Sequence, residues 1–382
     1  MKEQEINHWI HRIRPLEHET PYLLVDTAVG VQRVRELKEN LPDFEIYYAI
    51  KSFNDPRLIS AIDSLVDGYD VASLGECQSL IDNGISSKRM IFSNPTKMPK
   101  HISESNALGV DYFAFDSVDE IHKIAENAPS SNVYLRVVVP DQGSSFSLSK
   151  KFGVDPIHVV PMMSMAKELG LNPVGLAFHV GSQSENPFSW KAAIEMMGQI
   201  IERLKNIDIE ISFLDMGGGF PSAYTESAPG ISLICDVIKE AVSNNIPSGI
   251  RLAIEPGRFV AAPTSVLVTS VSARAQRSGN EWLYLDVGAF NGVIEPLELP
   301  GWQYPIALVE DSAGEEVTNF ILTGPTCDSC DTFGQDISLP SVVRRGDRLM
   351  IGNAGAYTVE YASNFNGFDI PKRYYIDYKH EK

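Results

Sequence analysis

Residues 45–51 read EIYYAIK, and this run of apolar, aromatic and β-branched side chains predicts a buried strand. The stretch that follows, PRLISAIDSL (56–65), has apolar residues at helical spacing. Seven further strand candidates alternate with helical patterns in the same way: GYDVAS (68–73), MIFSN (90–94), DYFAFD (111–116), VYLRVVV (133–139), GLAFHVG (175–181), SFLDMGG (212–218) and RLAIEPG (251–257). Strands that alternate with helices pair in parallel, so residues 22–262 are predicted to form a (β/α)8 barrel.

The alternative to a barrel is a doubly wound open sheet, which the same alternation also suits. The dinucleotide-binding form of that fold opens its first helix with Gly-x-Gly-x-x-Gly. This chain has no such motif at that place, which counts against a dinucleotide fold.

After about residue 262 the helical spacing stops. Strand-like runs separated by turns follow: SVLVTSVSARAQ (265–276), EWLYLDVG (281–288), YPIALVED (304–311), NFILTG (319–324), DRLMIGNAG (347–355) and RYYIDY (373–378). The turns carry Gly, Pro, Asn and Asp. These runs predict a second, C-terminal domain of β structure over residues 263–382, either a barrel or a sandwich. Residues 1–21 precede the barrel repeat and could pack on either part.

The composition narrows the class of function. Hydrophobic residues make up 43% of the 382 residues, and the formal net charge is −18. Because Lys and Arg supply affinity for nucleic acid and anionic membranes, neither is an expected partner. The N-terminus lacks the apolar segment of a secretory signal, and no apolar run reaches the length of a membrane span. Four cysteines are too few for a disulfide scaffold, so a cytoplasmic protein is predicted.

Polar residues and glycines stand at the ends of the predicted strands, which is where the chemistry of a (β/α)8 barrel gathers. They are Lys51, Asp70, Asn94, Arg136, His179, Gly217, Gly218, Gly219, Glu255, Gly257 and Arg258. Each has an ordinary structural interpretation when it is taken alone. The diversity of the set is what suggests a site.

Lys51 and His179 each allow two interpretations. Lys51 could be the first solvated residue after a strand, or a desolvated amine that forms a Schiff base in the mouth of the barrel. His179 could be a satisfied core histidine, or a flat ring that stacks on a cofactor or moves a proton. Ser182 follows closely and could donate a hydrogen bond to a phosphate.

DMGGGFP (215–221) and EPGRFV (255–260) follow the last two predicted strands. Three glycines in a row can be a plain connector, or can present backbone N–H groups to an anion. Arg258 could pair with Glu255 on the surface, or fork onto a phosphate. The phosphate sites of such barrels use the loops after strands seven and eight, which favours the second interpretation in both cases.

Taken together, the set offers a Schiff-base lysine, a phosphate cradle, a stacking ring and a carboxylate for a pyridine nitrogen. These are the groups that pyridoxal 5'-phosphate (PLP) requires. No metal site is predicted, because Cys327 and Cys330 lack a second pair of ligands: Cys77 and Cys235 fall in predicted barrel helices.

Several stretches resemble, in sequence and in order, those of the fold-type III PLP-dependent decarboxylases, and within them the ornithine decarboxylase group. They are YYAIK (47–51), DVASLGE (70–76), LSKKFGV (148–154), FHVGSQ (178–183), LDMGGGFP (214–221), EPGRFV (255–260), GPTCDS (324–329) and GAYTVEYASNFNGF (355–368). The likeness covers nearly the whole chain from about residue 20. It implies a barrel of the alanine racemase-like kind and a C-terminal β domain.

The resemblance implies a role for each residue around the cofactor. Lys51 would form the Schiff base, His179 would stack on the pyridine ring, and Glu255 would hold its nitrogen. Asp70, Glu76 and Arg136 would surround Lys51 and the cofactor. The phosphate would be bound by Ser182, Gly217, Gly218, Gly219, Gly257, Arg258 and Tyr357.

The resemblance also implies a head-to-tail homodimer with shared active sites. Cys327 and Asp328 would act on the cofactor of the other subunit. Cys327 would return a proton to the substrate's α carbon, and Asp328 would meet its distal amine. The carboxylate that leaves as carbon dioxide would lie over an apolar face near Phe365.

The expected substrate is a basic L-amino acid: L-ornithine, giving putrescine for polyamine biosynthesis, or L-lysine, giving cadaverine. Substrate choice in the group depends on the segment that reads VIEPLELPGWQYPI (293–306) here. The resemblance implies an Asp at one position of this segment in bacterial relatives, for which Glu298 is the nearest candidate here, and Pro296 and Pro300 stiffen the loop. Arginine, diaminobutyrate, diaminopimelate or a bulkier conjugate are alternatives. Diaminopimelate decarboxylases carry Glu after the cysteine, and this chain has Asp328. A catalytically silent regulatory homologue is the alternative of another class.

The Cys-x-x-Cys spacing at Cys327 is interpreted as incidental. A redox pair would open a helix in a thioredoxin-like unit, and this stretch lies in the predicted β domain. Cys330 is therefore expected to be a small buried residue.

Overall fold

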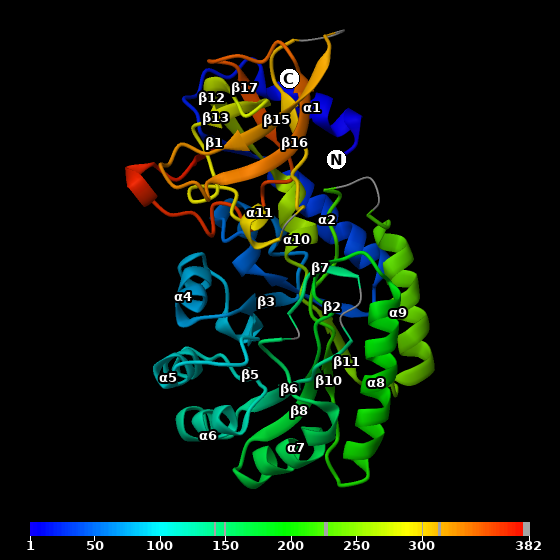
Figure 1. The fold of residues 1–382 in the computed structure, drawn as a ribbon. Helices are drawn as coiled ribbons and strands as arrows, with labels where there is room; N and C mark the ends of the chain where they lie inside the picture. The colour runs from blue at the N-terminus through cyan, green and yellow to red at the C-terminus, as the bar shows by residue number, and fades with distance from the viewer. Residues whose placement is uncertain (141–142, 149, 225–227, 300, 312–314, 377–382) are drawn as a thin grey trace. The chain divides into compact units, whose positions relative to one another are not determined.

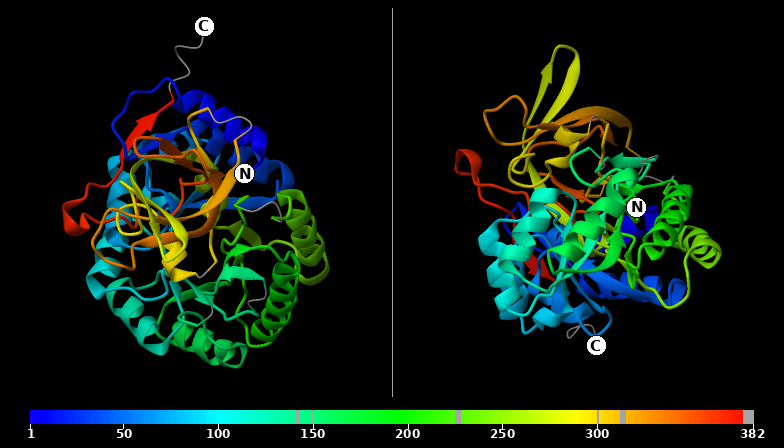
Figure 2. Two further views of the ribbon diagram at one scale, coloured as in Figure 1. Left: turned by 45° about the horizontal axis from the view of Figure 1, so that its top comes forward. Right: turned by 90° about the horizontal axis from the view of Figure 1, so that it is seen from below.

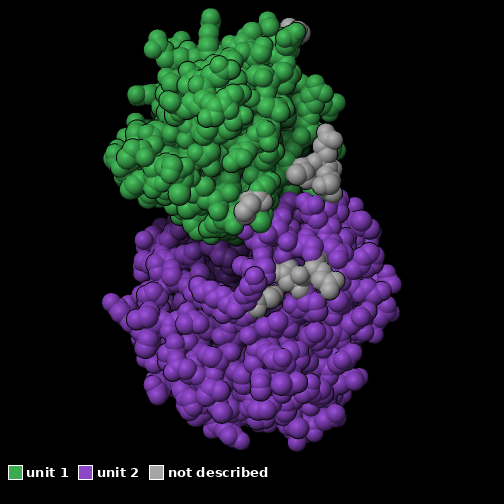
Figure 3. Space-filling view, viewed as in Figure 1, with its two compact units in different colours: residues 1–30, 222–228, 260–382 green, residues 31–221, 229–259 purple. Residues whose placement is uncertain are grey.

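The computed structural model describes residues 1–140, 143–148, 150–224, 228–299, 301–311 and 315–376. The described chain divides into two compact units, coloured separately in Figure 3. Unit 1 comprises residues 1–30, 222–228 and 260–382, and unit 2 comprises residues 31–221 and 229–259. The domain boundaries at residues 22 and 262 stay a prediction.

Unit 2 is a closed barrel of parallel strands (Figure 1). Within the described residues its eight strands are β2 (Phe44–Ala49), β3 (Gly68–Val71), β4 (Met90–Phe92), β5 (Tyr112–Phe115), β6 (Asn132–Arg136), β8 (Asn172–Ala177), β10 (Phe213–Asp215) and β11 (Arg251–Ile254). The barrel closes where Leu252 of β11 pairs with Phe44 of β2. The predicted (β/α)8 barrel is confirmed, and the open sheet is excluded.

Helices connect these strands and lie outside them (Figure 2). They are α3 (Pro56–Ile62), α4 (Leu74–Asp82), α5 (Pro99–Ala107), α6 (Val118–Asn127), α7 (Val159–Glu168), α8 (Phe188–Lys205) and α9 (Ile231–Asn245), and α2 (Thr27–Asn40) precedes β2. Side-chain caps fix where several of them begin: Asp55 accepts from the N–H of Arg57 and Leu58, and Ser73 accepts from that of Glu76. In the loops that follow β6 and β8, the short strand β7 (Ser144–Phe146) pairs antiparallel with β9 (Ser182–Ser184).

Side chains fill the interior of the barrel. Aromatic residues face alanines across it, in a cluster of Tyr47, Ile91, Ala114, Tyr134, Ala177, Phe213 and Ala253. All the described barrel strands except β3 contribute a residue to this cluster, as packing in layers requires. Because the middle is filled, polar side chains have room only at the two ends of the strands.

Unit 1 contains the predicted second β domain. Its sheet orders the strands β14 (Ile306–Leu308), β17 (Arg348–Ile351), β12 (Ser265–Arg277), β13 (Asn280–Leu285), β15 (Val317–Thr323) and β16 (Thr332–Pro340). An early strand, β1 (Tyr22–Val25), pairs antiparallel with β12 and parallel with β18 (Lys372–Tyr375). The end of the predicted strand RYYIDY lies outside the described residues.

Helix α1 (Glu3–Ile13) packs on this sheet in unit 1. Trp9 and Ile13 are buried in one cluster with Tyr22, Val268 and Met350, among others. No described helix combines the length and the apolar character that a membrane span requires.

Candidate active site

Lys51 lies just beyond β2, in the 3₁₀ turn Ile50–Ser52. Its Nζ is hydrogen-bonded and ion-paired to Oδ2 of Asp70 on β3. The Asp70 side chain is fully buried, whereas the Lys51 side chain is 41% exposed. The second oxygen of Asp70, Oδ1, is buried and has no hydrogen-bond partner among the described residues. A buried acceptor without a donor suggests that a bound group belongs beside it.

His179 stands two residues beyond β8. Its Nδ1 accepts a hydrogen bond of 3.0 Å from the N–H of Gly181, which places the proton of the neutral ring on Nε2. Burial, followed by the positive charges of Arg136 and Lys51, lowers the pKa of His179 well below its ordinary value. The ring is therefore neutral, and a cofactor can stack on it without meeting a charge.

Glu255 directly follows β11 and is buried. It accepts a hydrogen bond from Oγ of Ser93, and Ser93 in turn accepts one of 2.9 Å from Tyr134 OH. Burial is the largest cause that raises the pKa of Glu255, followed by the negative charge of Asp70. A cavity of about 20 Å³, enough for one water molecule, is lined by Ser93, Ala114, Tyr134, Arg136, Ala177, Phe178, His179, Asp215 and Glu255.

The loops after β8, β10 and β11 supply donors for an anion. Arg258 is buried, and its Nε donates a 3.2 Å hydrogen bond to Oγ of Ser182. Gly219 has a φ of +96°, and a Cβ there would lie 2.5 Å from the carbonyl oxygen of Gly181. A Cβ on Gly257 would lie 3.0 Å from that of Ser52. Guanidinium, hydroxyl and bare glycine N–H groups are the donors that phosphate takes.

The other site residues predicted on the barrel also have defined places. The Arg136 guanidinium lies 5.3 Å from the centre of the Phe152 ring. The Glu76 carboxylate accepts from the N–H of Ala72 at 2.6 Å, at the start of α4. Gly217 has a φ of +63°, and a Cβ on Gly218 would lie 2.6 Å from the carbonyl oxygen of Glu255.

Unit 1 holds the remaining predicted residues. Cys327 and Asp328 lie in the turn between β15 and β16, and both are exposed. The N–H and the Sγ of Cys327 both donate to Oδ1 of Asn366, at 3.3 and 3.4 Å. Cys330 is exposed in the same turn, so the expectation of a buried residue was wrong. Its backbone N–H caps the Asp328 carboxylate at 2.9 Å, which holds the residue at the surface of the turn.

The buried side chain of Asp331 holds the turn that carries Cys327 and Asp328. It is fully buried and accepts from the N–H of Ala289 at 2.7 Å and from the N–H and Oγ of Thr326 at 3.1 and 2.7 Å. A Cβ on Gly324 would lie 2.4 Å from its carboxylate oxygens, which explains the glycine at that place. The turn is thus a defined structure in a single chain.

Three further predicted residues also belong to unit 1. Tyr357 has a φ of +56° and stacks on Tyr361 with ring centres 5.9 Å apart. Phe365 is exposed in the 3₁₀ turn Phe365–Gly367. Glu298 is the exposed last residue of the one-turn helix α11 (Glu295–Glu298), which is anchored where Tyr304 OH donates to the buried Glu295 at 3.0 Å.

The sequence motifs did not point to Ser93, Tyr134, Asp215 or Asn366. Asp215 could have been found, because it ends a predicted strand just before the glycines that were singled out. Ser93 immediately precedes Asn94 and could have been found in the same way. Tyr134 and Asn366 carry no such signal, since one is an inward strand residue and the other lies in an irregular loop.

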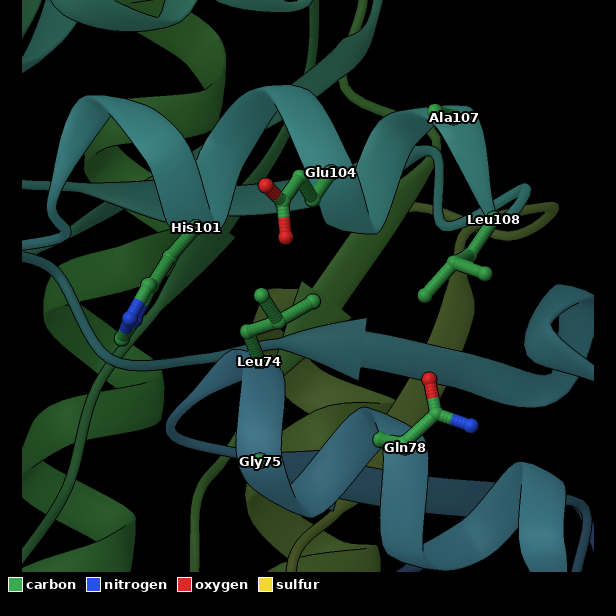
Figure 4. Close-up of a pocket in the computed structure, with 7 residues that line it drawn as sticks. All are labelled: Leu74, Gly75, Gln78, His101, Glu104, Ala107 and Leu108. Atoms are coloured by element: carbon green, nitrogen blue, oxygen red, sulfur yellow. The ribbon is translucent and has the colours of Figure 1, made fainter.

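A larger cavity of about 530 Å³ lies outside the ring of strands, between α4 and α5 (Figure 4). Leu74 and Gln78 on α4 face His101, Glu104 and Leu108 on and after α5. None of the predicted site residues lines this cavity. The cavity is therefore separate from the candidate site at the strand ends.

The chemistry of the residues at the strand ends fits PLP: an amine, a carboxylate, a neutral ring, phosphate donors and the unpaired Oδ1 of Asp70. Residues 29–262 match the family model described as "Pyridoxal-dependent decarboxylase, pyridoxal binding domain". The chain belongs to the pyridoxal-dependent decarboxylases. As a member of this family it is a PLP-dependent amino-acid decarboxylase, and PLP is its cofactor.

Relatives of this pyridoxal-dependent decarboxylase cover nearly its whole length. Ornithine decarboxylase of Schizosaccharomyces pombe is 32% identical over 88% of this chain and 79% of its own. The solved structure of lysine/ornithine decarboxylase from Vibrio vulnificus with cadaverine is 31% identical, with a TM-score of 0.88, and covers 99% of this chain and 100% of its own. Arginine decarboxylase of Paramecium bursaria Chlorella virus with agmatine has a TM-score of 0.90 at 26% identity, covering 97% and 100%.

Proposed function

We propose that this decarboxylase converts L-ornithine to putrescine, with L-lysine, which gives cadaverine, as its second substrate. The observation that carries the proposal is the pair of exposed carboxylates in unit 1, Asp328 beside Cys327 and Glu298 on α11. A distal ammonium group suits such carboxylates. The relatives named above act on ornithine, on lysine and ornithine, and on arginine, which supports a basic amino acid.

The residues of unit 2 hold the cofactor in this proposal. Lys51 binds it covalently, Glu255 faces its ring nitrogen, and His179 packs on its ring. Its phosphate is bound by Ser182, Gly217, Gly218, Gly219, Gly257 and Arg258, and by Tyr357 of unit 1. When bound, PLP supplies an electron sink for the bond that releases carbon dioxide.

The residues of unit 1 act on the substrate. Asp328 binds and orients the distal ammonium group, and Glu298 sets how long a chain fits. Phe365 offers an apolar surface beside the departing carboxylate and excludes water from it. Sγ of Cys327 delivers a proton to the α carbon after carbon dioxide has left.

We further propose a head-to-tail homodimer in which Cys327 and Asp328 complete the site of the partner subunit. The exposure of Cys327, Asp328 and Phe365 in a single chain supports this, because groups that act on a substrate need to be enclosed. Each active site for putrescine formation would then be built from residues of both subunits.

Mixing two inactive variants tests the shared site. Lys51→Ala and Cys327→Ala subunits are reassociated and assayed together. Half of the randomly formed dimers are mixed, and each mixed dimer has one intact site, so about a quarter of wild-type activity is expected. No recovery of activity in a mixture shown to exchange subunits would refute the shared site.

The substrate is tested by carbon dioxide release from ornithine, lysine, arginine, diaminopimelate and 2,4-diaminobutyrate. We expect the largest kcat/KM for ornithine and the next largest for lysine. A larger kcat/KM for arginine than for ornithine would indicate that Glu298 binds a guanidinium group. That result would contradict the proposal. Release from none of the five by PLP-loaded protein would favour a silent homologue, although Lys51, Glu255, Arg258, Cys327 and Tyr357 are all present.

Glu298→Asp is expected to shift the preference from ornithine toward lysine. The shorter side chain lengthens the space for substrate by about one methylene, and one methylene is worth roughly 1–3 kcal/mol in such pockets. The ratio of kcat/KM for lysine to that for ornithine should therefore rise about tenfold or more. Glu295→Asp is unsuitable as a control because Glu295 anchors α11, whereas Glu316→Asp, an exposed change in the same unit, should leave the ratio unchanged.

A further inference from the structure

Asp215 and Glu255 form a pair of buried carboxyl groups. The roles proposed above include Glu255 but give no role to Asp215. Asp215 ends β10, and it pairs in register with Ala253 of the neighbouring β11, two residues before Glu255. The two residues are 1% and 8% exposed, and both line the cavity of about 20 Å³ described above, so their carboxyl groups lie close together. Two ionised carboxylates offer only acceptors, so one of the two must carry a proton.

The remaining hydrogen bonds indicate which group carries it. Ser93 accepts from Tyr134 OH, so the single hydroxyl hydrogen of Ser93 is directed to Glu255. Asp215 receives only a backbone donor among the described contacts, the N–H of Gly217, which reaches Oδ1 at 2.9 Å. Glu255 therefore has a hydroxyl donor in addition to the shared proton, as the ionised member of a pair requires.

The surrounding charges favour the same assignment. Burial, and then the negative charge of Glu255, raise the pKa of Asp215 well above its ordinary value. Burial also raises the pKa of Glu255, but the charge of Lys51 and the hydrogen bond from Ser93 act against it. The other charged groups near the pair are Asp70, which raises both pKa values, and Arg136, which adds positive charge at the end of β6.

We propose that Asp215 is a positioning residue that holds the shared proton, and so keeps Glu255 ionised and aimed at the cofactor's ring nitrogen. This rests on the proposed role of Glu255. Asp215 donates through Oδ2 to Glu255 and accepts at Oδ1 from Gly217. The Asp215 side chain would thus fix the end of β10, the glycine loop that follows it and the position of Glu255.

Two variants separate a protonated from an ionised Asp215. In Asp215→Asn, the amide oxygen can still accept from Gly217 and the amide nitrogen can donate to Glu255, without any titrating group. We expect the dissociation constant for PLP to stay within about threefold of wild type. In Asp215→Ala, the donor is lost, and the dissociation constant should rise about tenfold, the effect of one hydrogen bond to a charged group. Because Glu255 acts on the cofactor, kcat should fall in Asp215→Ala with little change in KM.

Infrared difference spectra provide a readout that does not depend on turnover. Wild-type minus Asp215→Asn protein at neutral pH should show the carbonyl band of a protonated carboxylic acid, shifted in heavy water. Asp26→Ala is the matched control. Asp26 is equally buried at 2% exposure and accepts from the N–H of Ala28, two residues on, at 3.0 Å. That variant should leave PLP affinity unchanged.

The proposal is overturned if the acid band is missing, or if Asp215→Asn weakens PLP binding as strongly as Asp215→Ala does. The infrared result and the Asn variant decide the question even where the Ala variant does not fold. Failure of the proposed function would show differently, as wild-type protein that binds PLP and releases carbon dioxide from no basic amino acid.

Discussion

Lys51→Ala is expected to abolish decarboxylation and to remove the visible absorbance band of the bound cofactor. The variant would lose both the proposed covalent attachment and the amine that is proposed to exchange with substrate. Turnover should fall on the order of 10⁴-fold, the upper end of what one proton-transferring group contributes.

Lys51→Ala also leaves the buried Asp70 carboxylate without its ion pair. Since Lys51 is partly exposed, we expect a modest loss of folding stability, about 1–3 kcal/mol, measured by denaturant unfolding of the apoprotein.

Lys38→Ala is a matched control for this result. Lys38 also pairs with an aspartate, Asp67, at 3.1 Å, and its side chain is 39% exposed. That variant should keep the absorbance band and full turnover. A wild-type protein that remains colourless after incubation with PLP, or a Lys51→Ala protein that retains the band, would contradict the role of Lys51.

The second large effect is expected in Cys327→Ala. The cofactor should remain bound, because Cys327 lies in unit 1 and the proposed attachment is Lys51 of unit 2. Turnover to the amine should fall about 10²–10³-fold, in the range of a lost general acid. Without a proton delivered to the α carbon, part of the turnover should be diverted to transamination, in which the proton would be added to the cofactor instead and the cofactor would retain the amino group. That fraction departs as an amino aldehyde, whose oxygen comes from water.

Chromatography of amine and aldehyde products after a single turnover measures this partition. Cys330→Ala is the control, since Cys330 is a second exposed thiol in the same turn. It should leave both rate and partition unchanged. Cys77 and Cys235 are buried, and burial raises the pKa of their thiols to about 11 and about 12, so neither competes in chemical labelling of Cys327. Unchanged kinetics in Cys327→Ala would refute its role as acid.

The barrel could be predicted because its strands are buried on both faces and read as continuous apolar runs. Strand β2 shows the limit of this signal. Its apolar pattern continues to Lys51, but the hydrogen-bonded strand ends at Ala49 and a 3₁₀ turn follows. Helix α5 carries a weak helical signal, because PKHISESNA has little apolar periodicity and Ile102 is its only large buried side chain among the described residues.

Two strands of unit 1 could not be found from local sequence. Strand β1 has only four residues, and it is defined by pairing with β12 and β18 from the far end of the chain. Strand β16 contains Gly334 and Asp336, the latter with a φ of +56°, and its pairing with β15 shifts register. Such residues read as a turn, and only the partner strand shows otherwise.

Some residues of the candidate site could likewise be predicted from the sequence pattern, and others could not. The rule that chemistry follows parallel strands singled out Lys51, His179 and Glu255, which come directly or closely after strands of one barrel. Cys327 and Tyr357 follow no such rule, because they lie in loops of unit 1, and the resemblance alone singled them out. The expectation for Cys330 failed because a small apolar residue was assumed to be buried, whereas the turn places it at the surface.

The carboxylate of Asp331 has a consequence for how the enzyme evolves and how tightly it binds. It orders the Cys327 turn during folding, so the conformational entropy of that loop is lost before substrate arrives. A loop that became ordered only on binding would subtract roughly 0.5–1.5 kcal/mol from affinity for each immobilised side chain. Preorganisation also constrains change, since substitution of Asp331 or Gly324 would displace Cys327 and Asp328 together. New substrate preferences should therefore arise in the separate α11 loop, where Glu298 can vary without moving Cys327.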